Sequence, residues 1–306
     1  MRLAKFVKDN FLLCFGVVLI LLLLFVTFVG PYLPLIDQEL EEVQYLWTED
    51  DIPIPPPFEP SNENYLIGSD HAGRDLLSLL VMGAKETLLV VILITLVRYI
   101  IAIPLAFFAH KKWLGTHLML NWLNGFLSYI PTILMVLLIV MLPPFLFTEF
   151  RPVYLVLIIA LVEVGRAADA VKLELDEISS KEYILSGVVA GAGSFRLFKY
   201  YFLPFIYGKL IVYMITDLGK VMFLIGQLAF IGVFVSQYLI QVDAGQFAIR
   251  NSSISWPMLL MNATRDIRMA IWIPFWSAFA MAFTIFSLNI LAQGIQNLFK
   301  KRNTYI

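Results

Sequence analysis

Long apolar runs alternate with short polar segments along almost the whole chain. The first run, residues 11–29, follows a basic start that contains Arg2, Lys5 and Lys8. Five more apolar runs follow, at residues 87–109, 113–141, 153–165, 205–235 and 269–295. A helix that crosses a bilayer needs about 20 predominantly apolar residues, and only the run at residues 153–165 falls clearly short of that length. The pattern predicts an all-α polytopic membrane protein.

The positions of the basic residues predict how these helices are oriented, because Lys and Arg are enriched on the cytoplasmic side of membranes. Both termini are basic, so an even number of crossings is expected. The run at residues 153–165 then crosses as well and continues as a helix past Arg166. The basic residues placed inside are Arg2, Lys5, Lys8, Lys111, Lys112, Arg166, Lys172, Lys181, Arg196, Lys199, Lys300, Lys301 and Arg302, and those outside are Arg74, Lys85, Arg151, Arg250, Arg265 and Arg268. This sorting predicts six transmembrane helices with both termini in the cytoplasm.

The run nearest the N-terminus has a second interpretation, a cleavable signal peptide. The apolar core of a signal peptide normally has about 7–15 residues and precedes a small-x-small cleavage site. Residues 11–29 form a longer run that ends in Phe28-Val29-Gly30-Pro31. We therefore expect a first transmembrane helix that is retained.

The polar segments divide the chain into parts. Residues 31–75 carry eleven acidic residues against one basic residue, Arg74, and the proline-rich residues 53–60 favour an extended conformation. A solvated external loop is the simpler interpretation, and docking of a positively charged partner is the alternative. The predicted parts are an N-terminal tail and first helix (1–30), an external acidic loop (31–86), a five-helix core (87–298) with a cytoplasmic loop (166–201) and an external loop (236–268), and a basic cytoplasmic tail (299–306).

The composition narrows the class of protein further. The chain has 306 residues, of which 60% are hydrophobic and only 15% charged, which is typical of a polytopic membrane protein. The basic residues are few and dispersed, so no nucleic-acid partner is expected. Cys14 is the only cysteine, and His71, His110 and His117 lack the spacing of metal ligands. No GxxxxGK[ST], HExxH or GxSxG motif occurs. We expect a protein that is not an enzyme and that binds no metal or cofactor itself.

Ionisable residues inside the apolar runs are the first candidates for function. Arg98 lies near the middle of the second run, and Asp217 and Lys220 lie near the middle of the fifth, with Gln227 two turns further on. An unpaired charge at the bilayer centre costs about 2.5–3.5 kcal/mol on insertion scales. Asp217 and Lys220, at i and i+3, are expected to neutralise each other, which leaves Arg98 to find water, a carbonyl or a partner subunit. Two readings stay open: pairs that tie helices together, or residues that line a wet pathway.

A polar, Gly-rich segment lies between the fourth and fifth runs. Residues 182–190 contain one glycine and no proline, so they predict a short helix that ends at Gly191 and Gly193. The basic residues Arg196 and Lys199 follow, and Pro204 opens the next apolar run. An irregular backbone that carries charged side chains is excluded from lipid. The segment must therefore face water and any protein on that side of the membrane.

Three blocks of residues occur in a fixed order along the chain. The first is Gly68-Ser69-Asp70-His71-Ala72-Gly73-Arg74-Asp75-Leu76-Leu77-Ser78, the second is the Gly-rich segment with Gly191 and Phe202-Leu203-Pro204, and the third is Ser255-Trp256-Pro257-Met258-Leu259. They resemble the G-T-D-x-x-G-R-D-x-x-S, E-A-A-x-x-x-G and S-W-G-x-M-L motifs of the permease subunits of binding-protein-dependent ABC importers. Within the peptide/nickel group, the chain is most similar to the C-type permease of oligopeptide and dipeptide transporters, over residues 65–298.

One position departs from the family pattern. Where the family has E-A-A, this chain has Leu185-Ser186-Gly187, so the family's glutamate is missing. Glu182, almost one helical turn earlier, is the residue that could take over a salt bridge to the ATPase.

The resemblance implies a type I importer permease in a bacterial inner (plasma) membrane, which forms half of a heterodimeric pore. It implies four kinds of partner: a second permease subunit, two cytoplasmic ATPases that bind ATP and Mg, an extracytoplasmic substrate-binding protein, and membrane lipid. The implied ATPase-coupling residues are Glu182, Tyr183, Leu185, Ser186, Gly187, Ala190, Gly191, Arg196 and Pro204. The implied external signature comprises Gly68, Asp70, Gly73, Arg74, Asp75, Ser255 and Trp256, and the expected pathway residues are Arg98, Asp217, Lys220 and Gln227.

Two other classes of function remain open from the sequence. An ion-gradient-driven secondary transporter or channel also explains the charged residues in the apolar runs. A non-transporting membrane scaffold would use the acidic loop for docking. The cargo is expected to be an oligopeptide or dipeptide, with nickel or another small solute as the alternative that the family allows.

Overall fold

The fold is described from a computed structural model. It describes residues 7–47, 51–61, 65–146, 148, 150–243, 246–251 and 253–303, so Arg2, Lys5, Glu49, Asp50 and Glu63 lie outside the described residues. The α-helices are α2 (Phe11–Phe28), α3 (Leu76–His110), α4 (Thr116–Tyr129), α5 (Thr132–Val140), α6 (Pro143–Leu146), α7 (Arg151–Val162), α8 (Val164–Ser179), α9 (Glu182–Val189), α10 (Ser194–Leu197), α11 (Leu203–Phe230), α12 (Ala263–Met269) and α13 (Trp272–Asn303).

Shorter elements connect these helices. They are the 3-10 turns η1 (Gly30–Tyr32), η2 (Trp113–Gly115) and η4 (Trp256–Leu260), the π-turn η3 (Phe198–Phe202), and the strands β1 (Leu46–Trp47), β2 (Pro53–Ile54), β3 (Gln237–Asp243) and β4 (Gln246–Asn251). The strands form two antiparallel hairpins, β1–β2 in the acidic loop and β3–β4 in the loop at residues 236–268. The all-α prediction therefore holds for the helical body, and the predicted extended conformation is present at Pro53–Ile54.

Four helical segments within the described residues are long and apolar enough to cross a membrane: α2, α3, the continuous Ser194–Phe230 segment that ends in α11, and α13. The other two predicted crossings are helical but interrupted. Between α4 and α5, Ile130 is extended and precedes Pro131, because a residue before proline avoids the α conformation. Between α7 and α8 the helix is interrupted at Glu163 and then continues past Arg166 to Ser179, as predicted.

The helix α3 begins earlier than the apolar pattern predicts, at Leu76 instead of residue 87. The residues before position 87 include polar side chains, so hydropathy alone places the boundary too late. Asp75 supplies the missing start signal, because its carboxylate accepts the N–H of Ser78 as an N-cap.

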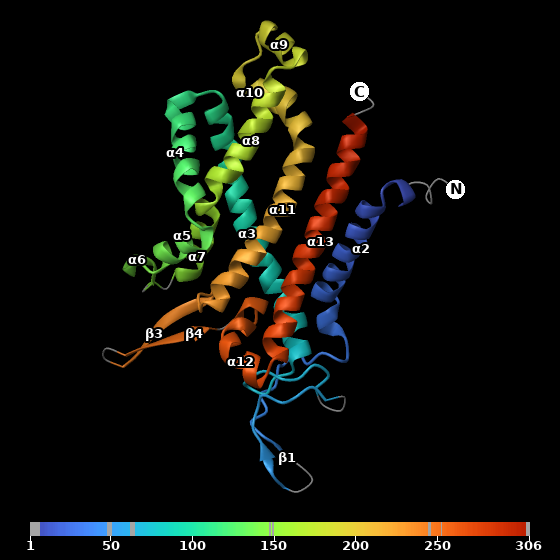
Figure 1. Cartoon of the computed structure of the whole chain (residues 1–306), viewed down its shortest axis with the longest axis vertical. Helices are drawn as coiled ribbons and strands as arrows, with labels where there is room; N and C mark the ends of the chain where they lie inside the picture. Colours follow the sequence, from blue (N-terminus) through green and yellow to red (C-terminus); the bar gives the residue numbers. More distant parts are fainter. Residues whose placement is uncertain are drawn as a thin grey trace.

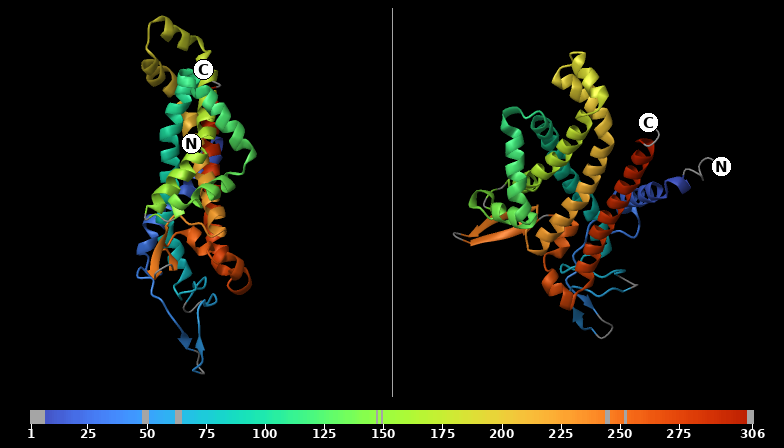
Figure 2. Two further views of the ribbon diagram at one scale, coloured as in Figure 1. Left: turned by 90° about the vertical axis from the view of Figure 1, so that its left-hand side faces the viewer. Right: turned by 45° about the horizontal axis from the view of Figure 1, so that its top comes forward.

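The helices form one elongated bundle in which α2 lies along α13 and α11 lies between α13 and α3 (Figures 1 and 2). The contact between α2 and α13 is very close. A Cβ atom added at Gly16 would lie 2.7 Å from the backbone of Leu291, and one added at Gly294 would lie 2.5 Å from the backbone of Leu13. Small residues allow helices to approach in this way in membranes, where backbone packing replaces the hydrophobic effect.

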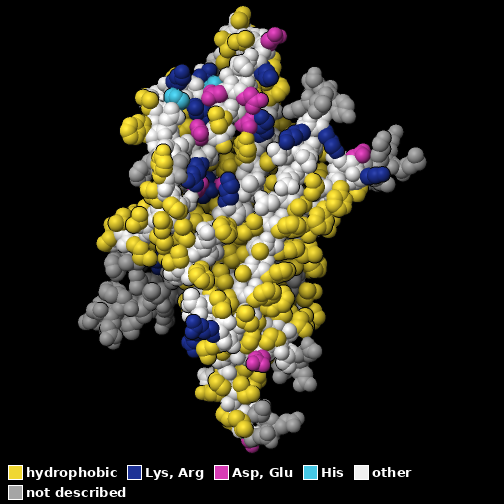
Figure 3. All heavy atoms as spheres, in the orientation of Figure 1, with side chains coloured by type: hydrophobic (Ala, Val, Ile, Leu, Met, Phe, Trp, Pro, Cys, Tyr) yellow, Lys and Arg dark blue, Asp and Glu magenta, His cyan; other side chains and the backbone are white. Residues whose placement is uncertain are grey.

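Two apolar clusters fill the interior of the bundle. One joins α3, α5, α7 and α11 through residues such as Ile94, Ile159 and Met222, and the other joins α3, α8 and α11 through Ala102 and Leu175. The outside of the bundle is also apolar over its middle part, while charged side chains gather toward one end (Figure 3). A helical body with apolar side chains both inside and outside is expected where lipid is the solvent.

The elements are sorted between the two ends of the bundle. The loop helix α9 projects at one end, and the described ends of the chain, at the start of α2 and the end of α13, lie toward that same end (Figure 1). The β1 strand, α12 and the start of α3 lie at the opposite end. This sorting places the first and third sequence blocks together and the second block far from them.

Candidate functional site

The first block, Gly68–Ser78, forms a compact turn that caps α3. Asp70 lies at its centre and accepts the backbone N–H groups of Ala72 and Arg74 at 3.0 and 2.9 Å. Its other carboxylate oxygen pairs with the guanidinium of Arg74 at 2.6 Å. Asp75 accepts both the N–H and the hydroxyl of Ser78, at 2.8 and 2.6 Å. The carboxylates of this block are thus used to fix the backbone.

Glycine is required in this turn by geometry. Gly68 and Gly73 have φ of +92° and +78°, and a Cβ atom at Gly73 would lie 2.0 Å from the carbonyl oxygen of Val43. The hydroxyl of Tyr65 donates to the carbonyl of Gly73 at 3.1 Å. Burial, with Asp75 and Asp70 nearby, raises the pKa of Tyr65, so the hydroxyl keeps its proton and remains a donor.

The third block, with Ser255 and Trp256, joins α3 to α13 at the same end. The indole N–H of Trp256 donates to the carbonyl of Leu80 at 2.7 Å, and its backbone N–H donates to Thr87 at 2.9 Å. Ser277 of α13 donates to the carbonyl of Trp256 at 2.6 Å. Ser255 accepts a hydrogen bond from Ser253 at 2.7 Å. The structure therefore brings the first and third blocks together, both on α3.

The second block forms the predicted short helix, α9, from Glu182 to Val189. Gly191 has φ of +76°, and the N–H of Ala192 returns to the carbonyl of Gly187 at 3.1 Å. A left-handed glycine with such a returning hydrogen bond is a common way to end a helix. The predicted stop at Gly191 is confirmed, while Gly193 instead precedes the next helix, α10.

The helix α9 has an inner and an outer face. Ile184 and Gly187 are buried, Tyr183 stacks on Phe205 at 4.4 Å, and a Cβ atom at Gly187 would lie 2.9 Å from the Tyr201 ring. Burial raises the pKa of Tyr183. Gly187 therefore serves packing inside the loop. Its contribution to a surface for a partner stays a prediction, and within the chain its side-chain position faces Tyr201.

The outer face of α9 is apolar and exposed. Leu185, Val188 and Val189 have 55%, 53% and 88% of their surface exposed. The remaining predicted coupling residues, Glu182, Ser186, Ala190, Gly191, Arg196 and Pro204, are also exposed. The position where the family has glutamate is thus occupied by an exposed leucine on this apolar face.

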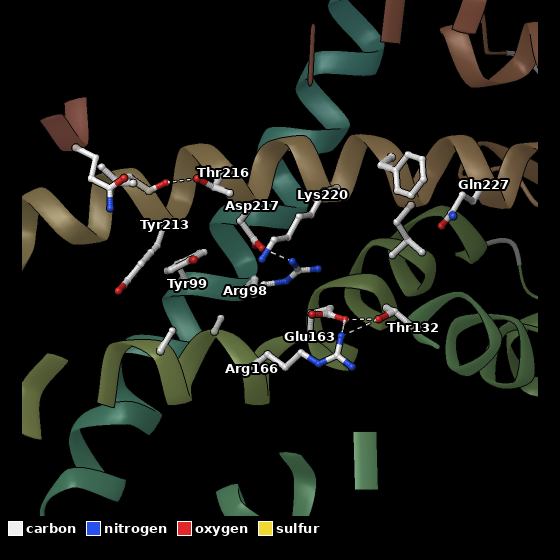
Figure 4. A pocket seen from close by; sticks show the side chains of 17 residues that line it. Arg98, Tyr99, Thr132, Glu163, Arg166, Tyr213, Thr216, Asp217, Lys220 and Gln227 are labelled. Atoms are coloured by element: carbon white, nitrogen blue, oxygen red, sulfur yellow. Dashed lines mark hydrogen bonds and ion pairs between the residues drawn. The ribbon is translucent and has the colours of Figure 1, made fainter. Parts of the chain in front are cut away.

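A cavity of about 640 Å³ lies between α3, α5, α8, α11 and α13 (Figure 4). It is the place where the ionisable residues of the apolar runs meet. Its lining includes Arg98, Tyr99, Thr132, Glu163, Arg166, Tyr213, Thr216, Asp217, Lys220, Gln227 and Gln296. All four predicted pathway residues therefore line one space.

Arg98 and Asp217 form a buried ion pair, with Nη1 and Oδ2 2.6 Å apart and side chains 1% and 9% exposed. The direct ion pair of Asp217 is thus with Arg98 and not with Lys220, because α3 packs beside α11 and brings Arg98 onto Asp217. Arg98 also donates to the carbonyls of Ile159 and Ala160, at 2.8 and 3.3 Å. These carbonyls lie in the last turn of α7, where the N–H of Glu163 donates to the carbonyl of Leu161. The first reading of these charges, a pair that ties helices together, thus describes Arg98 and Asp217.

A second polar group in the cavity is one that the sequence analysis missed. Arg166 donates to Glu163 at 2.7 Å and to the carbonyl of Leu127 at 2.8 Å, and the hydroxyl of Thr132 also donates to Glu163. The i, i+3 spacing of Glu163 and Arg166 on one helix was a usable signal for this pair. Its link to Thr132 depends on the packing of α5 against the α7–α8 segment.

Among the described residues, Lys220 and Gln227 are two polar lining residues without such fixed partners. Among the residues that the structure describes, Lys220 has no carboxylate within ion-pair distance and no hydrogen bond. Tyr213, Thr216, Lys220 and Gln227 follow one another at helical spacing, so α11 presents a polar stripe to the cavity (Figure 4). The second reading, residues that line a polar space, thus fits Lys220 and Gln227.

A further charged cluster lies next to the cavity and was also missed. Lys209 pairs with Glu174 and, at 3.3 Å, with Glu177, and the hydroxyl of Tyr213 donates to Glu174 at 2.6 Å. The cluster joins α8 to α11 on the side of the cavity that leads to α9. Lys209 and Tyr213 lie 35 and 39 positions after Glu174 in the chain, so no local spacing reveals the cluster.

Comparison with known proteins gives relatives along most of the chain. No model of a protein family matches. The di/tripeptide transport system permease protein DppC of Pseudomonas aeruginosa is 24% identical over 286 residues, which is 92% of this chain and 85% of that protein. The dipeptide transport system permease protein DppC of Bacillus subtilis is 26% identical over 294 residues, 95% of this chain and 82% of that protein. The oligopeptide transport system permease protein OppC of Bacillus subtilis is 22% identical over 242 residues, 78% and 72% of the two chains. The resemblance carried by the three sequence blocks is thereby confirmed: this chain is a homologue of the permease subunits of dipeptide and oligopeptide ABC transporters.

Proposed function

We propose that this chain is the permease subunit of an ATP-driven importer and forms one half of a pore for dipeptides, oligopeptides or a related small solute. A second permease subunit completes the pore, an extracytoplasmic binding protein delivers the solute, and two cytoplasmic ATPases drive transport. The observation that carries this proposal is the exposed apolar face of α9. The homology to peptide permeases supports the substrate class.

An exposed apolar face is unfavourable on a polar connecting loop unless a partner covers it. Leu185, Val188 and Val189 follow one another at the i, i+3, i+4 spacing of a helix that docks into a groove. The neighbouring loop adds Phe195, 75% exposed. Apolar patches of this kind mark protein–protein contacts. An ATPase surface with an apolar groove is the partner that fits, and no glutamate at position 185 is then needed.

The inner face of α9 supports a mechanical connection to the cavity. Tyr183 stacks on Phe205 in the first turn of α11, and Gly187 packs against Tyr201 just before that helix. The helix α11 then runs without interruption past Asp217, Lys220 and Gln227. When ATP closes the ATPases, movement of α9 is passed to α11 as a rigid body. Such rocking of packed helices about a central site is a general route to alternating access.

The arrangement of the ends supports six crossings with both termini in the cytoplasm of a bacterial cell. The described ends of the chain lie toward the same end of the bundle as α9 (Figure 1), which fits an even number of crossings. In this proposal α4–α5 and α7–α8 are the third and fourth crossings, each interrupted once. Their interruptions, at Ile130 and Glu163, lie beside the cavity residues Thr132 and Arg166.

The test is uptake of a labelled dipeptide into cells or vesicles that hold the complete transporter. We expect Val189→Asp to lower ATP-driven uptake at least about tenfold, because a charge would replace the most exposed apolar side chain of the docking face. Val189 is 88% exposed, so the loop itself should keep its fold. Leu114→Asp, at a leucine 97% exposed in another loop at the same end, is the matched control and should leave uptake unchanged.

Co-purification gives the second readout of the same experiment. The chain should purify with ATPase subunits, and Val189→Asp should lose them while the level of the protein in the membrane stays constant. Uptake that follows an ion gradient without nucleotide would overturn the proposal in favour of a secondary transporter. Unchanged uptake and unchanged ATPase binding in Val189→Asp would also overturn it.

A further inference from the structure

The charges that line the cavity do not balance. Three cations, Arg98, Arg166 and Lys220, face two carboxylates, Glu163 and Asp217. Arg98 is paired with Asp217 at 2.6 Å, and Arg166 with Glu163 at 2.7 Å. The remaining positive charge is that of Lys220, which forms no ion pair among the described residues, because the carboxylate it lies near, Asp217, is already paired with Arg98.

Lys220 lies in the middle of α11, which runs from Leu203 to Phe230 and is part of a segment long and apolar enough to cross a membrane. A lone ammonium group at that depth is unfavourable in lipid and is retained only where water or an anion reaches it. The side chain projects into the cavity beside Arg98 and Asp217 (Figure 4). The geometry therefore leaves Lys220 open to water or to an anionic ligand that enters the cavity.

We propose that Lys220 is the anion-binding position of this cavity and takes the C-terminal carboxylate of a peptide; this rests on the function proposed above. Every linear peptide carries one such carboxylate whatever its side chains, which matches one unpaired cation. Gln227 lies seven residues further along the same face of α11, about 10 Å away along the helix. An extended peptide covers that distance in about three residues. The amide of Gln227 is thus placed to bind the backbone of a dipeptide or tripeptide held at Lys220.

The competing explanation is that a carboxylate of the partner permease neutralises Lys220 in the assembled pore. The two explanations predict different electrostatic potentials in the cavity, which a small charged reagent can detect. A free Lys220 attracts anions and repels cations, whereas a neutralised one does neither. A peptide carboxylate, in addition, competes only with the free form.

The experiment uses membranes that contain the complete transporter, and in this chain Cys14→Ser removes the only cysteine and Thr216→Cys adds one. Thr216 lines the cavity one turn before Lys220, and its hydroxyl donates to the carbonyl of Val212 in the same helix. The rates of modification by an anionic and a cationic methanethiosulfonate are compared. We expect the anionic reagent to be favoured, and Lys220→Gln to lower the anion-to-cation rate ratio about tenfold or more. Val189→Cys, on the exposed loop, is the control whose ratio Lys220→Gln should not alter.

The ligand is then probed with dialanine and with its C-terminal amide. Dialanine should slow modification of Thr216→Cys, the amide should not, and Lys220→Gln should abolish the protection. A rate ratio that Lys220→Gln leaves unchanged, equal protection by both peptides, or a cysteine inert to both reagents would each overturn the proposal. None of these readouts needs ATP or uptake, so their failure is distinct from a failure of the Val189→Asp test.

Discussion

At the scale of single residues, the cavity separates two roles that look alike in the sequence. Asp217 and Lys220 both lie in the middle of the same apolar helix, yet only Asp217 is fixed by partners. A buried ion pair adds little net stability compared with apolar residues of the same volume, but removal of one partner leaves the other charge uncompensated. Arg98, with the Asp217 carboxylate and two carbonyls around it, is therefore a residue that holds α3, α7 and α11 in one arrangement.

This role predicts a large effect for a change at Asp217. Asp217→Leu should destabilise the protein by about 3–5 kcal/mol, because Arg98 would remain buried without a counter-charge. Addition of Arg98→Met to the same chain should recover most of the loss. The measurement is thermal unfolding of the protein purified in detergent.

The matched control for that change is Lys220→Gln on the same helix, which removes a charge that no described carboxylate pairs. It should change stability by less than about 1 kcal/mol. If Asp217→Leu were as stable as Lys220→Gln, the ion pair would have no structural role.

At the scale of elements, the start of α3 shows why hydropathy alone misplaces a helix boundary. The apolar pattern begins at residue 87, but the capping side chain of Asp75 and the turn at Gly68–Arg74 begin the helix at Leu76. Polar residues in the first turns are compatible with a helix whose first orphan N–H groups are satisfied. The first sequence block is therefore best understood as a structural cap on which the Trp256 contacts are built.

The cap predicts that two glycines with the same backbone conformation differ in their tolerance of alanine. Gly73 and Gly115 have φ of +78° and +70°. A Cβ atom at Gly73 would collide with the backbone of Val43, whereas one at Gly115 would have no described atom within 4 Å. Gly115→Ala should cost about 1–2 kcal/mol, the penalty of a left-handed alanine. Gly73→Ala should cost about 1–3 kcal/mol more, because the backbone carbonyl of Val43 has to move.

Thermal unfolding of both variants in the same detergent measures the difference. Equal destabilisation by the two changes would mean that the approach of Val43 to the turn is looser than the structure describes.

At the scale of the whole molecule, the two ends of the bundle have different chemistry. One end holds α9 with its exposed apolar face and the described ends of the chain, and the other holds the capped start of α3, the Trp256 contacts and α12 (Figures 1 and 2). An importer needs this division, because its ATPases and its binding protein act on opposite sides of the membrane. The cavity, with Lys220 and Gln227, lies between the two ends.

This arrangement predicts opposite accessibility of the two ends. In a Cys14→Ser chain, Leu66→Cys, at a residue 53% exposed before the first block, should react with a membrane-impermeant maleimide in spheroplasts. Val189→Cys should react only in inverted vesicles. Reaction of Val189→Cys in intact spheroplasts would place α9 outside the cell, where no ATPase could bind it.

The sequence by itself determined those features whose causes are local. The apolar runs define the long helices, the residues 182–190 and the left-handed Gly191 define α9, and the three ordered blocks identify the relatives. Each depends on neighbouring residues in the chain, so pattern and spacing suffice. The replacement of the family's glutamate by Leu185 could likewise be read directly.

Only the tertiary structure decided how the charges are paired. Arg98 meets Asp217 across 119 positions, Glu163 meets Thr132 across 31, and Tyr213 meets Glu174 across 39. In an apolar helix every face is apolar, so the sequence does not specify which helices pack side by side and which polar groups then meet. The interruptions at Ile130 and Glu163 and the close contact of α2 with α13 also belong to this level. Arg98, and not Lys220, forms the ion pair with Asp217 because α3 packs beside α11.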